Sequence, residues 1–132
     1  MGMAEQATFE EAFADLYRAG FRAAYRVTGD AEASEDAASE ALVRAGLRWR
    51  SIVDRELPFV VRVATNLAID HVRRQAQVVR ADPSEQTDPG AEPAYRELDL
   101  HRALQTLPKR QRQVVVLRYF GDLTERQIAG EL

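Results

Sequence analysis

Residues 58–75 read PFVVRVATNLAIDHVRRQ and show the hydrophobic periodicity of an α-helix. Apolar side chains recur in this stretch at the spacing that one face of an α-helix requires. They are Phe59, Val60, Val63, Ala64, Leu67 and Val72. Pro58 suits the first turn of a helix, because the amide hydrogen that proline lacks would have no partner there. The stretch therefore predicts an amphipathic helix from about 59 to 75 that ends strongly basic, with Arg73 and Arg74.

Two further helices are predicted upstream of this stretch. Thr8 and Glu11 have the spacing of a capping box, in which each side chain bonds the backbone of the other residue. Helical spacing then continues to a stop at Gly29, so the first helix is expected at about 9–28. The second helix, at about 32–49, has a narrow apolar stripe made largely of small residues. Small residues permit close packing of helices.

The remaining sequence divides the chain into segments. Residues 51–57 interrupt the helical pattern and are predicted to form a loop. Residues 77–94 contain three prolines and a glycine without a sustained period, which is typical of a flexible linker. No strand pattern occurs. We therefore expect an all-α fold with a three-helix domain at 1–76, the linker at 77–94 and a shorter helical domain at 95–132.

Composition excludes several classes of site. The chain has 132 residues, no cysteine and two histidines that lie in separate predicted domains. Disulfides, thiolate metal ligands and cysteine nucleophiles are therefore excluded, and no metal site or cofactor is predicted. No apolar run approaches the roughly 20 residues of a membrane span, and the first residues lack the features of a secretory signal. The protein is expected to stay in the cytoplasm without membrane insertion.

Charge is distributed along the chain in blocks of alternating sign. The net charge is −3, yet residues 1–40 carry three basic and nine acidic side chains, and residues 41–80 carry eight basic and three acidic ones. Residues 81–100 are again acidic, and residues 101–132 are again basic. Such blocks indicate different partners along one chain, although segregated solvated faces produce the same pattern.

Three blocks of sequence occur in a defined order. Residues 35–42 read EDAASEAL, residues 62–74 read RVATNLAIDHVRR, and residues 107–120 read LPKRQRQVVVLRYF. In this order they resemble the core-binding helix, the region-two helix and the opening of region four in extracytoplasmic-function sigma factors of the sigma-70 family. The resemblance covers nearly the whole chain. It implies a transcription initiation factor, not an enzyme, that directs bacterial core RNA polymerase to promoters by recognising and melting the minus-ten element.

The family's core-binding helix docks on the clamp helices of the polymerase β′ subunit. The resemblance implies the same contact here through Glu35, Asp36, Ser39, Glu40 and Val43. Asp36 and Glu40 are one helical turn apart, so both carboxylates would face one basic partner. Ser39 replaces the glutamine that is usual in the family. Without the resemblance, a solvated acidic face would be the favoured explanation of these residues.

The family captures an extruded base of the minus-ten element with the loop before the region-two helix, here 51–57, while the helix holds the strands. The DNA-binding residues that the resemblance implies are Arg50, Arg55, Arg62, Asn66, Asp70, Arg73 and Arg74. Extruding a base costs a few kcal/mol, which a pocket and positive charge must offset. Asn66 can bond a base edge or a phosphate, and equally a neighbouring helix. Trp49 and Phe59 flank the loop, where core packing is favoured over stacking on bases.

Residues 95–132 are expected to supply only part of region four. Thr124 and Gln127 repeat the capping-box spacing at the start of the last predicted helix. The family's recognition helix for the minus-thirty-five element has no counterpart up to Leu132, so that readout is expected to be missing, and truncation of a longer protein is the simplest explanation. The basic residues that remain for phosphates or the polymerase β flap are Lys109, Arg110, Arg112 and Arg118.

Other functional classes explain less of the sequence. A DNA-binding regulator outside the sigma family would leave the match over residues 35–74 unexplained. An enzyme would need a phosphate loop, a nucleophile elbow or an acid/base pair, and the sequence shows none of these. A sigma-like interaction module held by an anti-sigma factor stays open as an alternative, because many relatives are restrained by such inhibitors.

Overall fold

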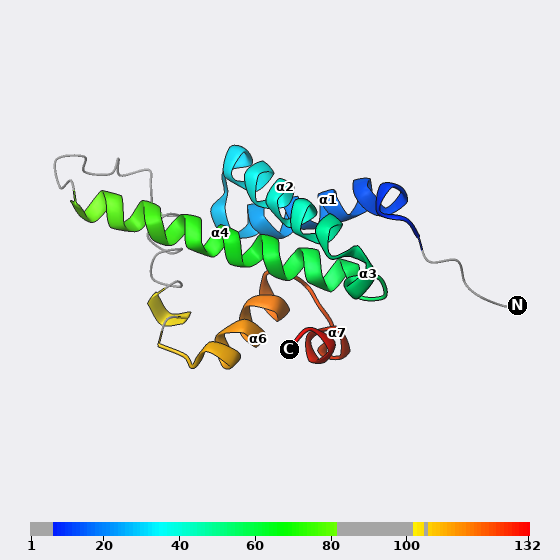
Figure 1. Ribbon diagram of the computed structural model, residues 1–132. Helices are drawn as coiled ribbons and strands as arrows, with labels where there is room; N and C mark the ends of the chain where they lie inside the picture. Colours follow the sequence, from blue (N-terminus) through cyan, green and yellow to red (C-terminus); the bar gives the residue numbers. More distant parts are fainter. Residues whose placement is uncertain (1–6, 82–101, 105) are drawn as a thin grey trace, which may run out of the picture.

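The computed structural model describes residues 7–81, 102–104 and 106–132 (Figure 1). Its helices are α1 (Phe9–Thr28), α2 (Ala31–Leu47), α3 (Trp49–Ile52), α4 (Glu56–Ala81), α6 (Lys109–Tyr119) and α7 (Glu125–Glu131). Residues 102–104 are also helical. No β-strand occurs among these described residues, which confirms the predicted all-α fold.

Side-chain and backbone caps set the bounds of α1 and α2. The Thr8 hydroxyl accepts a hydrogen bond from the Glu11 amide at 3.2 Å, which is the threonine half of the predicted capping box. Gly29 closes α1 at a φ of 65°, a left-handed conformation that glycine adopts without steric cost. The Asp30 carboxylate then accepts from the Ala33 amide at 2.9 Å and begins α2. The chain therefore reverses after Gly29, the predicted end of the first helix, and Asp30 caps the second.

The predicted loop at 51–57 is shorter than expected. Its first two residues belong to α3 and its last two belong to α4, so only residues 53–55 connect the helices. The reason lies at both ends of the connection, where Ile52 is 1% exposed and Phe59 is 2% exposed. Burying these side chains stabilises helical turns on either side of a tight connection.

α4 is longer than the sequence pattern predicted. It begins two residues before Pro58, which keeps this proline in the first turn, and it runs to Ala81 instead of ending near Gln75. Residues 77 and 78 are exposed and include no helix breaker, so backbone hydrogen bonding continues without an apolar face. The rest of the predicted linker, 82–94, lies outside the described residues.

Helices α1, α2 and α4, with the short α3, form what we call the three-helix unit, which packs around one apolar core. The buried residues of this core are Leu16, Ala41, Leu42, Ala45, Ile52, Phe59, Val60, Val63 and Ala64. Small residues allow the helix axes to approach closely. A Cβ atom placed on Gly20 would lie 3.2 Å from Cγ1 of Val60 and 3.6 Å from Cβ of Ala38. The small-residue stripe of α2 therefore has the packing role that its composition predicted.

Helices α6 and α7, which we call the C-terminal segment, lie beside α4 on the side away from α2 (Figure 1). Leu117, Leu123 and Ile128 are buried in a cluster with Ala23 of α1 and Val61 of α4. A second cluster joins side chains of α1, α2 and α4 to side chains from 104 and 116. Two short helices cannot bury their apolar side chains alone. In the structure, both helices bury these side chains against the three-helix unit.

The predicted capping box of α7 forms in full. The Thr124 hydroxyl accepts from the Gln127 amide at 3.1 Å, and the Gln127 side-chain oxygen accepts from the Thr124 amide at 2.9 Å. Asp122 precedes it at a φ of 53°, a conformation that aspartate tolerates better than most residues. These local interactions turn the chain sharply between α6 and α7.

Candidate functional site

The residues predicted to bind the polymerase lie on the solvent face of α2. All five are exposed: Glu35, Asp36, Ser39, Glu40 and Val43. Val43 is an apolar side chain that is 56% exposed. The opposite face of α2 is buried against α1 and α4. A helix of 3.6 residues per turn places these five positions in one stripe, so the structure brings all of them to a single surface, which we call the acidic ridge.

An open groove of about 460 Å³ runs between the acidic ridge and α4. Asp36, Ser39 and Glu40 line it from α2, and His71 and Arg74 line it from α4. The Nε2 atom of His71 is buried and has no hydrogen-bond partner among the described residues. Buried polar atoms in proteins are nearly always paired, so this atom marks a place that a bound partner can satisfy. The sequence pattern had given no sign of the groove.

The other candidates on α4 share a different face. Arg62, Asn66, Asp70 and Arg73 follow one another at intervals of four, four and three residues, which aligns them along one stripe of the helix. Arg62 and Asn66 are half-buried, whereas Asp70 and Arg73 are exposed. Arg74 is separated from this stripe, because it lines the groove beside α2. The predicted DNA-binding residues of α4 thus divide between two surfaces.

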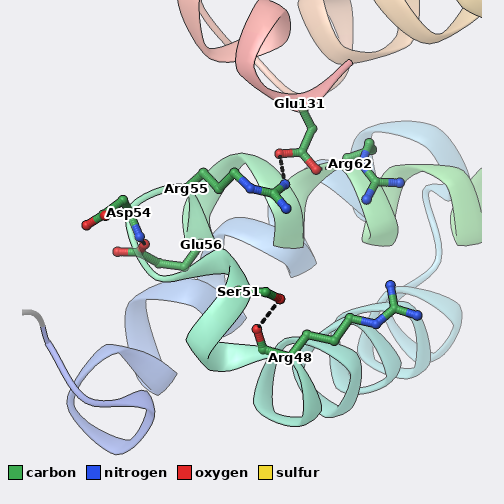
Figure 2. A network of polar contacts seen from close by, with 7 residues as sticks. All are labelled: Arg48, Ser51, Asp54, Arg55, Glu56, Arg62 and Glu131. Atoms are coloured by element: carbon green, nitrogen blue, oxygen red, sulfur yellow. Dashed lines mark hydrogen bonds and ion pairs between the residues drawn. The ribbon is translucent and has the colours of Figure 1, made fainter.

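The connection between α3 and α4 is held by local hydrogen bonds (Figure 2). The Ser51 hydroxyl donates to the Arg48 carbonyl at 2.8 Å, and the Asp54 amide donates to the Glu56 carboxylate at 3.1 Å. Asp54 has a φ of 151°, a backbone conformation that costs non-glycine residues on the order of 1–3 kcal/mol. Such strain persists only where the surrounding structure imposes it. The connection therefore presents Arg55 from a defined backbone.

Arg55 and Arg62 converge on Glu131 of α7 (Figure 2). Arg55 Nη1 lies 3.0 Å from Glu131 Oε2, and Arg62 Nε lies 2.7 Å from Glu131 Oε1. The Glu131 side chain is 0% exposed, whereas the side chains of Arg55 and Arg62 are 43% and 26% exposed. The arginines are separated from Glu131 by 76 and 69 residues. No local sequence signal could have revealed this contact.

The two aromatic residues beside the α3–α4 connection are packing residues, as predicted. Phe59 is 2% exposed within the core, and Arg62 lies over its ring at 5.4 Å from the centroid. Trp49 meets the ring of Phe9 edge to face at 5.5 Å and packs against the same core. Arg50, the neighbour of Trp49 on α3, is exposed. The rings thus support the connection from inside, and arginines cover it from outside.

Arg110 and Arg118 of the C-terminal segment bond the protein itself. Arg110 donates to the carbonyl of Leu132 at 3.3 Å, and Arg118 donates to the carbonyl of Leu123 at 3.2 Å. Lys109 is exposed at the start of α6. The arginine bonds support the ends of helices, so Lys109 is the better placed of these three for an external phosphate.

Within residues 7–81, 102–104 and 106–132, no three histidine, cysteine, aspartate or glutamate side chains gather where they could hold a metal ion. None of the described helices combines the length and the apolar character that a membrane crossing requires.

Comparison with protein families gives two matches, one in each part of the chain. The family described as Sigma-70 region 2 matches residues 12–78, which cover most of α1, all of α2 and α3, and most of α4. The family described as Sigma-70, region 4 matches residues 97–132, which include α6 and α7. The acidic ridge and the arginines of the α3–α4 connection therefore lie within the region 2 match.

Individual relatives agree with these matches. The RNA polymerase sigma factor SigV of Bacillus subtilis is 36% identical over 70 residues, 52% of this chain, and the match spans 42% of SigV. The ECF RNA polymerase sigma factor SigW of the same organism is 30% identical over 93% of this chain and 78% of its own length. The corresponding SigE of Mycolicibacterium smegmatis is 30% identical over 85% of this chain and 48% of its own. No solved structure matches significantly. The chain belongs to the extracytoplasmic-function (ECF) group of the sigma-70 family.

Proposed function

We propose that this protein directs bacterial core RNA polymerase to promoters, binding the polymerase through the acidic ridge and the minus-ten element through the α3–α4 connection and α4. One observation carries the proposal. A single three-helix unit presents an acidic surface on α2 and arginines in the α3–α4 connection and along α4. A factor that bridges a basic protein surface and a nucleic acid needs this pair of opposite charges on one body.

The acidic ridge has the composition of a protein-binding surface. Exposed carboxylates of Asp36 and Glu40 flank the exposed apolar side chain of Val43. Charged groups of this kind steer a basic partner to the surface, and an apolar side chain among them contributes burial on contact. Glu40 also pairs with Arg44 at 3.1 Å, but both side chains are about half exposed, so the pair is readily exchanged for a partner's arginine or lysine. We assign β′ clamp-helix binding to the acidic ridge.

The α3–α4 connection and α4 carry side chains that can hold a DNA strand with an extruded base. Arg50 and Arg55 precede α4 while Arg62, Asn66 and Arg73 follow along one face of that helix. Guanidinium groups offset the phosphate charge, and the Asn66 amide offers both a donor and an acceptor to a base edge. The buried anchors at Ile52 and Phe59 keep the connection in place while a base is unstacked. Recognition and melting of the minus-ten element are assigned to this surface.

The test is binding of the full chain to purified bacterial core polymerase, measured by co-elution and titration at moderate salt. Asp36→Arg or Glu40→Arg should each cost 2 kcal/mol or more, about thirtyfold in affinity, since a central charge would be reversed. Asp15→Arg is the matched control, because this side chain is 88% exposed on α1 and its replacement changes the net charge equally. If both ridge variants bind the polymerase as tightly as the wild type does, the polymerase site lies elsewhere on the protein. No binding at all would favour the alternative, a sigma-like module held by an anti-sigma factor.

A further inference from the structure

The contact of Arg55 and Arg62 with Glu131 has the chemistry of an occupied anion site. Two guanidinium groups, one from Arg55 just before α4 and one from Arg62 within α4, each donate to a different oxygen of one carboxylate, at 3.0 Å and 2.7 Å. Paired arginines around two oxygens of one anion are the arrangement by which proteins bind carboxylates and phosphates alike. The Glu131 side chain is fully buried in this position, so any other anion must displace it.

Glu131 reaches this site only because the C-terminal segment lies against α4. Leu117, Leu123 and Ile128 hold the segment there through one apolar cluster, and Val116 of α6 belongs to a second. Arg26 of α1 also pairs with Asp122. The approach is closest at Gly121, where an added Cβ would lie 2.5 Å from Cγ1 of Val61 and 2.8 Å from the Leu117 carbonyl. The interface therefore rests on two apolar clusters, ion pairs and one position that permits no side chain.

The C-terminal segment meets the three-helix unit through apolar clusters and ion pairs. Interfaces that combine a modest apolar patch with ion pairs resemble transient protein interfaces, so relative motion of the two parts is the default expectation. Glu131 and a DNA phosphate both carry negative charge and use the same donors. They cannot occupy the site together, because like charges at contact distance repel each other strongly in a partly buried site.

We propose that Arg55 and Arg62 form a binding site for a backbone phosphate of the promoter strand, and that Glu131 is its internal competitor. Docking of α7 against α4 and binding of DNA then exclude each other, so the closed chain is a restrained form of the factor. The inference rests on the proposed function, since it names how the assigned DNA surface is controlled. The occupant of the open site is single-stranded DNA, whose phosphates need no particular sequence to meet two arginines.

The first experiment measures the affinity of the full chain for a short fluorescent single-stranded DNA of mixed sequence by anisotropy. Glu131→Gln should bind about tenfold more tightly than the wild type, because a larger fraction of the protein has an open site. Glu125→Gln is the matched control, because it removes the same charge from the exposed first turn of the same helix. Equal affinities for the two variants would overturn the proposal.

Adding Arg55→Gln and Arg62→Gln to Glu131→Gln tests the site itself. These changes should cancel the whole gain in affinity if the two arginines are the phosphate ligands. A gain that survives their removal would show that Glu131 acts through another surface and would overturn the assignment. Far-UV circular dichroism of each variant establishes that the helices are retained.

The second experiment follows the position of the C-terminal segment directly. The chain has no cysteine, so cysteines placed at the exposed positions Ala14 of α1 and Gln111 of α6 accept a donor and an acceptor dye specifically. Energy transfer should fall when the DNA saturates the protein. Gly121→Ala should lower it without DNA, because the added Cβ has no space, whereas Gly130→Ala should not, because nothing lies within 4 Å of that position. Unchanged transfer in the DNA-saturated protein would refute mutual exclusion.

Polymerase binding separates failure of this inference from failure of the proposed function. If Glu131→Gln gains no affinity for DNA while polymerase binding still depends on Asp36, the inference is wrong and the function stands. If neither the wild type nor the opened variants bind polymerase or DNA, the proposed function is itself wrong.

Discussion

The three-helix unit and the C-terminal segment differ in where their buried side chains find neighbours. In the unit, Leu42, Phe59 and Val60 pack against residues of the unit itself. In the segment, Leu117 and Leu123 pack against side chains of α1 and α4. The unit therefore contains its own core, whereas the segment buries its apolar side chains against the unit. A self-contained core unfolds as a whole, whereas the contacts of the segment can be lost by its local separation from the unit.

The largest effect is expected from Phe59→Ala in the core of the unit. Phe59 is 2% exposed, so its removal should lower the free energy of unfolding by about 3–5 kcal/mol through lost burial and a remaining cavity. Denaturant unfolding followed by far-UV circular dichroism measures this. Leu57→Ala is the control, because Leu57 is 40% exposed, and it should cost less than about 1 kcal/mol. Similar losses for both variants would contradict a self-contained core.

Leu117→Ala should separate the two regions without unfolding the first. Leu117 is 1% exposed, and its truncation should weaken docking of the C-terminal segment by about 2–5 kcal/mol. Hydrogen exchange should show loss of protection in α6 and α7 and retention in α1, α2 and α4. Val114→Ala on the same helix, where the side chain is 42% exposed, should change little. Equal loss of protection in α4 would mean that the segment is part of the unit's core.

Removal of equivalent helix caps sharpens the comparison further. Asp30→Ala should lower the free energy of unfolding of the three-helix unit by about 1 kcal/mol, because the Ala33 amide loses its acceptor. Thr124→Ala removes a similar bond from α7, yet it should leave that unfolding free energy nearly unchanged and reduce only the exchange protection of the segment. The two regions would be one cooperative unit if both variants shifted the same denaturation midpoint equally.

The smallest effect is expected from the pair of Glu40 and Arg44 on α2. Both side chains are about half exposed, at 50% and 46%, and solvent screens their attraction. A double-mutant cycle with Glu40→Ala and Arg44→Ala should give a coupling energy of at most about 0.5 kcal/mol from thermal unfolding. A coupling above about 1.5 kcal/mol would make Glu40 a structural residue and weaken its assignment to the acidic ridge.

Local features of this protein could be predicted because local chemistry determines them. Thr8 and Asp30 cap helices, Gly29 ends one and Thr124 begins another, each through bonds within a few residues. The stripe from Glu35 to Val43 is exposed because its spacing sets it opposite the buried alanines. The ends of α3 and α4 were predicted less well. Their bounds depend on how deeply Ile52 and Phe59 reach into a core that other helices complete.

The sequence by itself determined the all-α class, the caps and the acidic ridge, because helical periodicity and capping act over a few residues. Only the tertiary structure decided that Arg74 lines the groove beside the acidic ridge and that Glu131 pairs with Arg55 and Arg62. The physical reason is distance along the chain. Docking of α7 depends on the summed burial of Leu117, Leu123 and Ile128 against two other helices, and no local pattern encodes that sum.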